Sequence, residues 1–88
     1  MKPYTQTIKN LKIIRTFDTN IKSDELVWHR DEKSRVVKIL EGRGWKFQRE
    51  NELPTLLKKG DEIFIPLNTY HRIFKGKTPL IIEITEQD

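Results

Sequence analysis

The stretch that decides the fold is Gly60-Asp61-Glu62-Ile63-Phe64-Ile65-Pro66-Leu67-Asn68-Thr69-Tyr70-His71. A turn signal at 59–61, with a glycine and an aspartate, opens this stretch, and a second turn signal at 67–69, with an asparagine, lies within it. Between these turns, Glu62 to Pro66 is a short β-rich segment, and another such segment begins at His71. This alternation of turn and strand predicts β-structure, and it continues in both directions along the chain.

The rest of the sequence repeats the same alternation. Turn signals recur at intervals of roughly ten residues, which is typical of an all-β sandwich or barrel. The predicted strands span residues 12–17, 26–30, 35–41, 45–49, 62–66, 71–75 and 80–85. The alternative is a helix over 23–41, but His29 to Arg35 is an unbroken polar run that interrupts any apolar helical stripe. A strand, a turn and a second strand are therefore expected there.

Length and composition restrict the class of protein. A chain of 88 residues predicts a single domain, 1–88, with a core so small that a metal or a partner subunit is expected to add stability. The absence of cysteine excludes disulfides, thiolate zinc sites and iron–sulfur clusters. No apolar run approaches the length of a membrane span, and no apolar stretch follows Met1. The expected location is therefore cytoplasmic.

The net charge of +4 is concentrated in one part of the chain. Residues 1–22 contain the whole excess of basic side chains, whereas basic and acidic residues balance over the remainder. A nucleic-acid interface usually clusters basic residues with aromatic ones on one face, and acidic residues are interleaved throughout this sequence. We therefore interpret 1–22 as a solvated basic strand segment and expect neither nucleic acid nor a membrane as a partner.

Three residues of the opening stretch also match a known motif. Gly60, Pro66 and His71 have the spacing of the second motif of the cupin superfamily, which this stretch resembles. Asn68 stands where that family has glycine, and both residue types tolerate the left-handed backbone of a tight turn. Lys75 stands where the family often has asparagine.

The first cupin motif is present in a degenerate form. When it is aligned so that 39–42 forms its end, at Gly42, His29 falls on the first histidine of the motif, Asp31 on the second histidine and Arg35 on the glutamate. Ser23 stands where the motif begins with glycine. The resemblance extends over residues 23–84.

The resemblance implies both a fold and a site. The fold is a small jelly-roll β-barrel of about seven to nine antiparallel strands, with a ligand or metal site inside it near the mouth. In metal-binding cupins the histidines and glutamate of the first motif and the histidine of the second surround one divalent ion. Members act as isomerases, dioxygenases, decarboxylases, sugar-binding regulators and seed storage proteins, so the fold alone does not give the activity.

The candidate metal ligands are His29, Asp31 and His71. On a strand, His29 and Asp31, which are two residues apart, would point to the same face, and His71 would come from a facing strand. Two histidines and one carboxylate suit a divalent transition metal with open coordination positions: iron, manganese, nickel or zinc. Open positions allow a metal to act as a Lewis acid or to activate oxygen.

Arg35 decides between this interpretation and its alternatives. A guanidinium at the position of a fourth ligand repels a dication unless Asp31 or Glu41 neutralises it. It could also pair with Asp31 and withdraw that carboxylate from a metal. The predicted function is binding of a divalent metal and a small, anionic molecule that pairs with Arg35. The alternative is a metal-free ligand-binding or assembly module without catalysis.

Two further residues are candidates for ligand binding. Along 45–50, Gln48 alternates with Trp45 and Phe47, so one of the two sets lines the barrel. If Gln48 points inward, it could contact a ligand; if the aromatic residues do, they form core or pocket wall. Tyr70 precedes His71, near the expected mouth, and is the second candidate.

The resemblance also implies a homodimer. Cupins commonly pair sheets between subunits, and small ones often exchange an N-terminal strand. Residues 7–17 have enough apolar side chains to form such an edge strand, and a domain of this size would gain stability from a partner.

Overall fold

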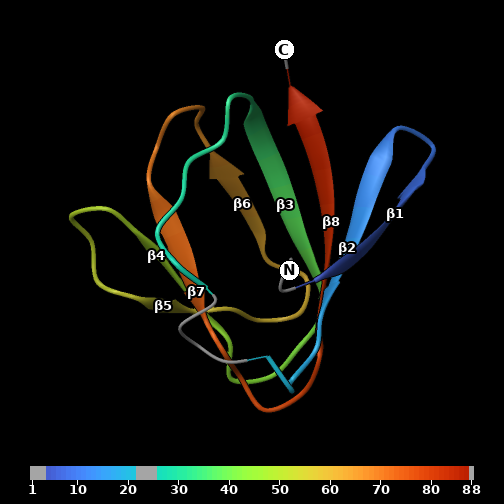
Figure 1. Cartoon of the computed structure of the whole chain (residues 1–88), viewed down its shortest axis with the longest axis vertical. Coiled ribbons are helices and arrows are strands. Elements are labelled where there is room, and N and C mark those ends of the chain that lie inside the picture. Colours follow the sequence, from blue (N-terminus) through green and yellow to red (C-terminus); the bar gives the residue numbers. More distant parts are fainter. Residues whose placement is uncertain (1–3, 22–25, 88) are drawn as a thin grey trace.

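The computed structural model describes residues 4–21 and 26–87, which form eight strands in two antiparallel sheets (Figure 1). The strands are β1 (Thr5–Lys9), β2 (Lys12–Phe17), β3 (Ser34–Glu41), β4 (Lys46–Arg49), β5 (Thr55–Leu56), β6 (Glu62–Ile65), β7 (His71–Phe74) and β8 (Leu80–Gln87). One sheet has the order β1-β2-β8-β3-β6, and the other has the order β5-β4-β7. The described residues contain no helix, so the all-β prediction is confirmed. Among them there is accordingly no helix that could cross a membrane.

The core lies between the two sheets and follows from strand alternation. On β3 and β8, the buried side chains Val37, Ile39, Leu80, Ile82 and Ile84 occupy every second position. Trp45 and Phe47 cover them from the smaller sheet, and the Trp45 side chain is fully buried. Its indole Nε1 donates a hydrogen bond to the carbonyl of Thr78 at 2.6 Å. Burial of each such side chain contributes about 1.5–3 kcal/mol, which holds the two sheets together.

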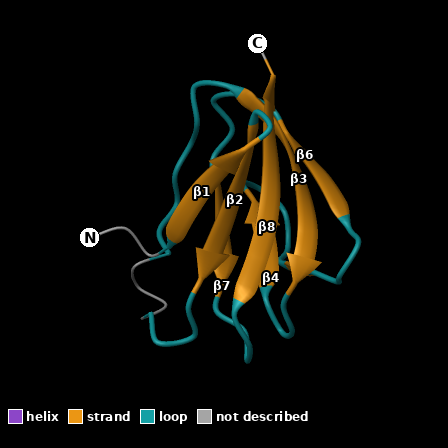
Figure 2. Ribbon diagram, turned by 90° about the vertical axis from the view of Figure 1, so that its right-hand side faces the viewer, coloured by secondary structure: helices purple, strands orange, loops and turns teal. Residues whose placement is uncertain are grey.

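The long central pair β3–β8 fixes the position of the residues before β3. Arg35 is opposite Glu86, and Val37 is opposite Ile84. The register shifts between Ile39 and Glu41, where one extra residue forms a bulge. Figure 2 shows β8 between β2 and β3 along the length of the larger sheet. The inner face of β3 therefore directs Arg35, Val37 and Ile39 toward the other sheet.

The N-terminal prediction needs correction. Residues 7–17 do not form one edge strand, because Asn10 and Leu11 have positive φ angles of 51° and 66° and turn the chain back on itself. β1 is the edge strand of the resulting hairpin, whereas β2 is an interior strand paired with both β1 and β8. Phe17 of β2 is part of the buried core, so this strand belongs to the domain itself.

The predicted strand at 26–30 is also wrong. Only one residue of this segment, His29, makes a β-bridge, and its partner is His71. The carbonyl of Val27 accepts a hydrogen bond from Nδ1 of the His29 ring at 3.0 Å. Ser23, the predicted first position of the motif, lies outside the described residues.

Candidate metal centre

The candidate site lies where the segment before β3 meets the start of β7. His29 and His71 are directly opposite each other: His29 N donates to His71 O at 3.0 Å, and His71 N donates to His29 O at 2.9 Å. Residues paired in this way project their side chains to the same side. The two rings meet edge to face with their centroids 4.3 Å apart. Two backbone hydrogen bonds thus bring together histidines that are far apart in the sequence.

Asp31 is held in place by the turn that follows β6. The backbone N of Asn68 donates to the carbonyl of Asp31 at 2.8 Å, and the N of Leu67 donates to Ser34 Oγ at 3.0 Å. Asn68 has a φ of 59°, in the left-handed region that asparagine tolerates better than most residues. The turn expected from Leu67, Asn68 and Thr69 is therefore present, and it ties the segment that carries Asp31 to β7.

Both imidazoles are oriented by the same kind of hydrogen bond. The Nδ1 of His29 lies 3.0 Å from the carbonyl of Val27, and the Nδ1 of His71 lies 2.9 Å from the carbonyl of Thr69. A carbonyl only accepts, so Nδ1 is the donor in each ring, and Nε2 of the neutral ring presents a lone pair. Histidines that ligate metals usually have such a partner on the other ring nitrogen, because it fixes the orientation of the ring.

The donor atoms of the three residues converge on one point. One ligand atom from each of His29, Asp31 and His71 lies within 4.8 Å of the others. Asp31 Oδ2 is buried without a hydrogen-bond partner in the described part of the chain, although it lies only 3.4 Å from His71 Nε2. Nε2 of the neutral His71 ring and Asp31 Oδ2 are therefore two acceptors that face each other. A divalent cation satisfies both at once, so these residues fit a metal.

The protonation state of His71 favours the same conclusion. Burial lowers the pKa of His71, and the nearby His29 and Arg35 lower it further. The hydrogen bond with Thr69 and the Asp31 carboxylate act in the opposite direction and raise the pKa. The net lowering keeps the imidazole neutral at neutral pH, which is the form that binds a metal.

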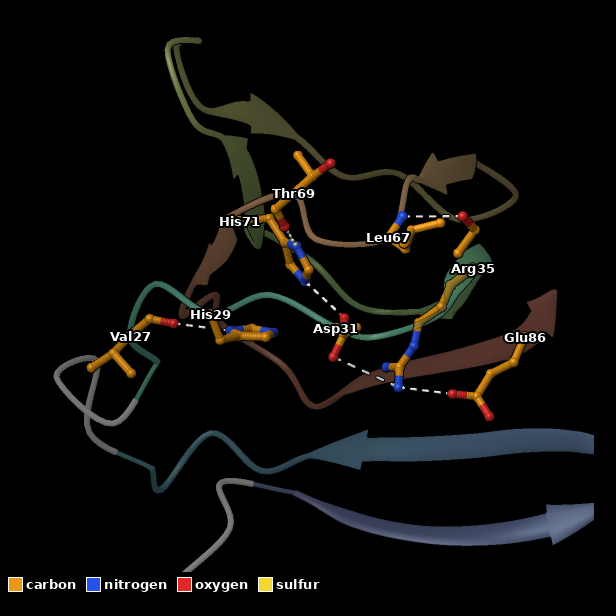
Figure 3. Close-up of polar contacts among 9 residues, drawn as sticks. Val27, His29, Asp31, Arg35, Leu67, Thr69, His71 and Glu86 are labelled. Carbon is orange, nitrogen blue, oxygen red and sulfur yellow. Dashed lines mark hydrogen bonds and ion pairs between the residues drawn. The ribbon is translucent and has the colours of Figure 1, made fainter. Parts of the chain in front are cut away.

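Arg35 lies on the other side of Asp31 from His71 (Figure 3). Its terminal NH2 nitrogen is 3.0 Å from Glu86 Oε2 and 3.7 Å from Asp31 Oδ1. Glu41, the other carboxylate considered from the sequence, pairs with Lys59 instead. Asp31 and Glu86 thus neutralise Arg35. The contact between Arg35 and Asp31 joins one guanidinium nitrogen to Oδ1 and is not bidentate, so Asp31 Oδ2 stays directed at His71.

The triad opens into a cavity of about 420 Å³ between the sheets. This volume is in the range of about 300–1,000 Å³ that is usual for small-molecule sites. Its polar wall consists of Tyr4, Arg15, His29, Asp31, Arg35 and His71. The remainder of the wall is apolar and consists mostly of core residues between the two sheets.

Gln48 and Tyr70 do not line this cavity. Phe47 is the inward residue of β4, so Gln48 faces outward, where it accepts a hydrogen bond from Arg72 Nε at 2.9 Å and donates one to Glu52 O at 2.8 Å. Tyr70 is 40% exposed and lies beside Arg30. Together with Trp28, these two residues line an open hollow on the outer face of the smaller sheet.

Arg15 and Tyr4 are the polar cavity residues that the sequence interpretation does not include. The charge pattern predicts a solvated position for Arg15, but Arg15 faces inward on β2, opposite Ile82 and in phase with the buried Phe17. Its guanidinium stacks on the ring of Tyr4 at 4.0 Å, and its Nε donates to Gln6 Oε1 at 2.9 Å. The alternation Ile13, Arg15, Phe17 was the available signal, since an inward arginine is unusual.

Comparison with known proteins gives the fold. No family model and no curated protein matches the sequence. Among solved structures, a cupin domain from Bordetella pertussis superposes with a TM-score of 0.62 at 18% identity, covering 97% of this chain and 92% of that one. The DMSP lyase DddQ from Ruegeria pomeroyi gives a TM-score of 0.75 at 18% identity over 88% of this chain, which spans 37% of the length of DddQ. Fe(II) HppE in complex with its substrate gives 0.69 at 13% identity over 96% of this chain and 52% of HppE.

These likenesses confirm the resemblance at the level of the fold: the chain has the cupin fold. The chain spans little more than a third of DddQ and about half of HppE, so the activities of those proteins are not transferred with the fold.

Proposed function

We propose that this cupin-fold protein binds one divalent transition metal through His29, Asp31 and His71 and holds a small anionic molecule in the adjoining cavity. The observation that carries the proposal is the buried, unpartnered Oδ2 of Asp31, 3.4 Å from the Nε2 lone pair of His71. Two apposed acceptors in a buried site cost free energy unless a proton or a cation lies between them. The lowered pKa of His71 disfavours a proton at this position, which supports a cation there.

The choice of metal follows from the ligand set. Two imidazoles and one carboxylate suit Fe²⁺, Mn²⁺, Ni²⁺ or Zn²⁺, and three protein ligands leave coordination positions open toward the cavity. HppE, which shares the fold, is described as an Fe(II) protein in complex with its substrate, and this supports iron among the candidates. A metal in this position would supply Lewis acidity to a molecule bound in the cavity.

The residues of the chain have distinct roles in this proposal. The hydrogen bonds to Val27 and Thr69 orient the two imidazoles, and the contact with Arg35 orients Asp31. The apolar wall excludes water and accommodates the body of the bound molecule. The rival function is a metal-free binding or assembly module, which the 3.7 Å contact between Arg35 and Asp31 favours because it gives that carboxylate a cationic partner without a metal.

Metal-dependent melting tests the proposal. Metal at about a hundredfold excess over its dissociation constant adds about 2.7 kcal/mol, which raises the melting temperature of a domain of this size by about 10–20 °C. Wild-type protein purified without an affinity tag should therefore melt higher with Mn²⁺, Fe²⁺, Ni²⁺ or Zn²⁺ and lower with chelator. His71→Ala and the near-isosteric Asp31→Asn should lose the difference.

The control is Glu50→Gln, which removes one exposed carboxylate outside the cavity and should keep the full shift. If none of the four metals changes the melting temperature of the wild type, the triad is a polar patch and the metal-free function replaces the metal-binding one. Elemental analysis of the same preparation identifies the bound metal.

A further inference from the structure

Arg15 and Arg35 both line the cavity, but their charges are balanced differently. Arg35 has two carboxylates near its terminal nitrogen, Glu86 at 3.0 Å and Asp31 at 3.7 Å. Arg15 has no carboxylate within ion-pair distance in the described part of the chain. Its side-chain contacts are the Tyr4 ring and one hydrogen bond from Nε to Gln6. The two terminal nitrogens of Arg15 are therefore donors without a protein acceptor among residues 4–21 and 26–87.

The surroundings of Arg15 make such a charge costly. Burial lowers the pKa of Arg15, and the nearby Arg35 lowers it further, because both disfavour the charged guanidinium. Tyr4, Asp31 and Glu86 act in the opposite direction but leave the net shift downward. A partly buried cation is retained at little cost only when an anion pairs with it. Since the chain supplies none at ion-pair distance, the partner is expected from outside.

The shape of the remaining wall limits that partner. Arg15 belongs to the polar side of a cavity of about 420 Å³ whose other walls are Val37, Ile39, Phe47 and further apolar core residues. A guanidinium with Nε already occupied still offers two N–H groups that match the two oxygens of a carboxylate. An apolar wall suits a hydrocarbon body and does not solvate a small, highly hydrated ion such as phosphate.

We propose that Arg15 is a carboxylate-binding residue of the cavity and that the ligand is a small organic carboxylate with an apolar body. This adds a second cation to Arg35, the anion-binding residue expected from the sequence, whose terminal nitrogen is paired with Glu86 and Asp31 and whose buried Nε has no hydrogen-bond partner among the described residues. The inference rests on the proposed function in that both place a ligand in one cavity. It assigns the anionic group to a residue outside the metal triad, so the two can be tested separately.

Hexanoate and hexanamide provide a matched pair of probes, because they share an apolar chain and differ in charge. Binding to the wild-type protein is measured by calorimetry and by melting temperature with chelator present and ionic strength held constant. Hexanoate should bind at least about tenfold more tightly than hexanamide, since a hydrogen bond to a charged group contributes about 1.5–3 kcal/mol. Inorganic phosphate, tested in parallel, should not raise the melting temperature.

Arg15→Gln should remove the preference for hexanoate, whereas Arg43→Gln, the same change at an exposed position outside the cavity, should keep it. Arg15→Lys retains a charge to support folding but lacks paired N–H donors, and it should weaken hexanoate binding. Equal binding of hexanoate and hexanamide by the wild type overturns the proposal, as does full hexanoate binding by either Arg15 variant. Stabilisation by phosphate equal to that by hexanoate overturns the carboxylate assignment.

Because chelator is present throughout, failure of hexanoate to bind leaves the metal-dependent melting of the proposed function untouched. Conversely, if metals do not change the melting temperature of the wild type but Arg15 still gives a preference for hexanoate, the carboxylate proposal stands and the metal proposal fails.

Discussion

Replacement of Arg35 by glutamine should tighten metal binding about tenfold. The terminal nitrogen of Arg35 lies 3.7 Å from Asp31 Oδ1, and its side chain is 14% exposed. For a divalent ion held by the same carboxylate, we take a separation from that nitrogen on the order of 6 Å, which is this contact plus a metal–oxygen bond of about 2 Å. The repulsion between two metal charges and one guanidinium charge is then about 1.4 kcal/mol with water-like screening, and about 5.5 kcal/mol at an effective dielectric constant of about 20.

The lower value is the better guide, because Glu86 lies 3.0 Å from the same nitrogen and offsets much of its field. A change of about 1.4 kcal/mol corresponds to a tenfold lower dissociation constant. Titration calorimetry with Mn²⁺ measures it directly, and Arg43→Gln serves as the control for loss of one positive charge. Arg35→Glu is a less clean probe, since it would add a third carboxylate beside Asp31 and Glu86.

If Arg35→Gln binds Mn²⁺ no more tightly than the wild type, the electrostatic reasoning is refuted. If binding becomes weaker, Arg35 contributes mainly by holding Asp31 in position. A matched measurement on Asp31→Asn, which should abolish binding, shows that the titration reports on this site.

Three other predictions can be checked independently. With chelator present, the free energy of unfolding should be greatest above a pH of about 6.5 and should fall below that pH. Burial lowers the pKa of His71, so the unfolded chain binds a proton there that the folded chain does not. A free energy of unfolding in urea that is flat between about pH 5 and 8 would contradict this prediction. Gly76→Ala should destabilise the protein by about 2 kcal/mol or more, because the added methyl group would collide with the Arg43 backbone and the Trp45 ring. The control Gly60→Ala adds a methyl group that meets no atom within 4 Å, and it should cost about 1 kcal/mol because of the φ of 92° at Gly60. Equal melting temperatures for the two variants would refute the packing around Trp45. We propose that β1, whose side chains are all exposed at the edge of the larger sheet, pairs with a second copy to form a homodimer, and a monomer mass by light scattering at micromolar concentration would remove that proposal.

The local pattern of the sequence was sufficient to predict the type of fold and one side of the site. Turn residues at intervals of about ten positions gave most of the strands, because turn chemistry is a property of neighbouring residues. The spacing of Gly60, Pro66 and His71 placed His71 at the start of β7, after a turn in which Asn68 has the expected left-handed backbone. The grouping of His29 with Asp31 and His71 also followed from that resemblance.

The tertiary structure alone decided which faces and which charges meet. Alternation along β4 predicts that Phe47 and Gln48 point in opposite directions, but only the burial of Phe47 in the core shows that it is the inward one. The neutralisation of Arg35 by Glu86 and the inward position of Arg15 depend on β2, β8 and β3 lying side by side. A strand pattern specifies two faces without saying which is buried, because burial is determined by strands that come from elsewhere in the chain.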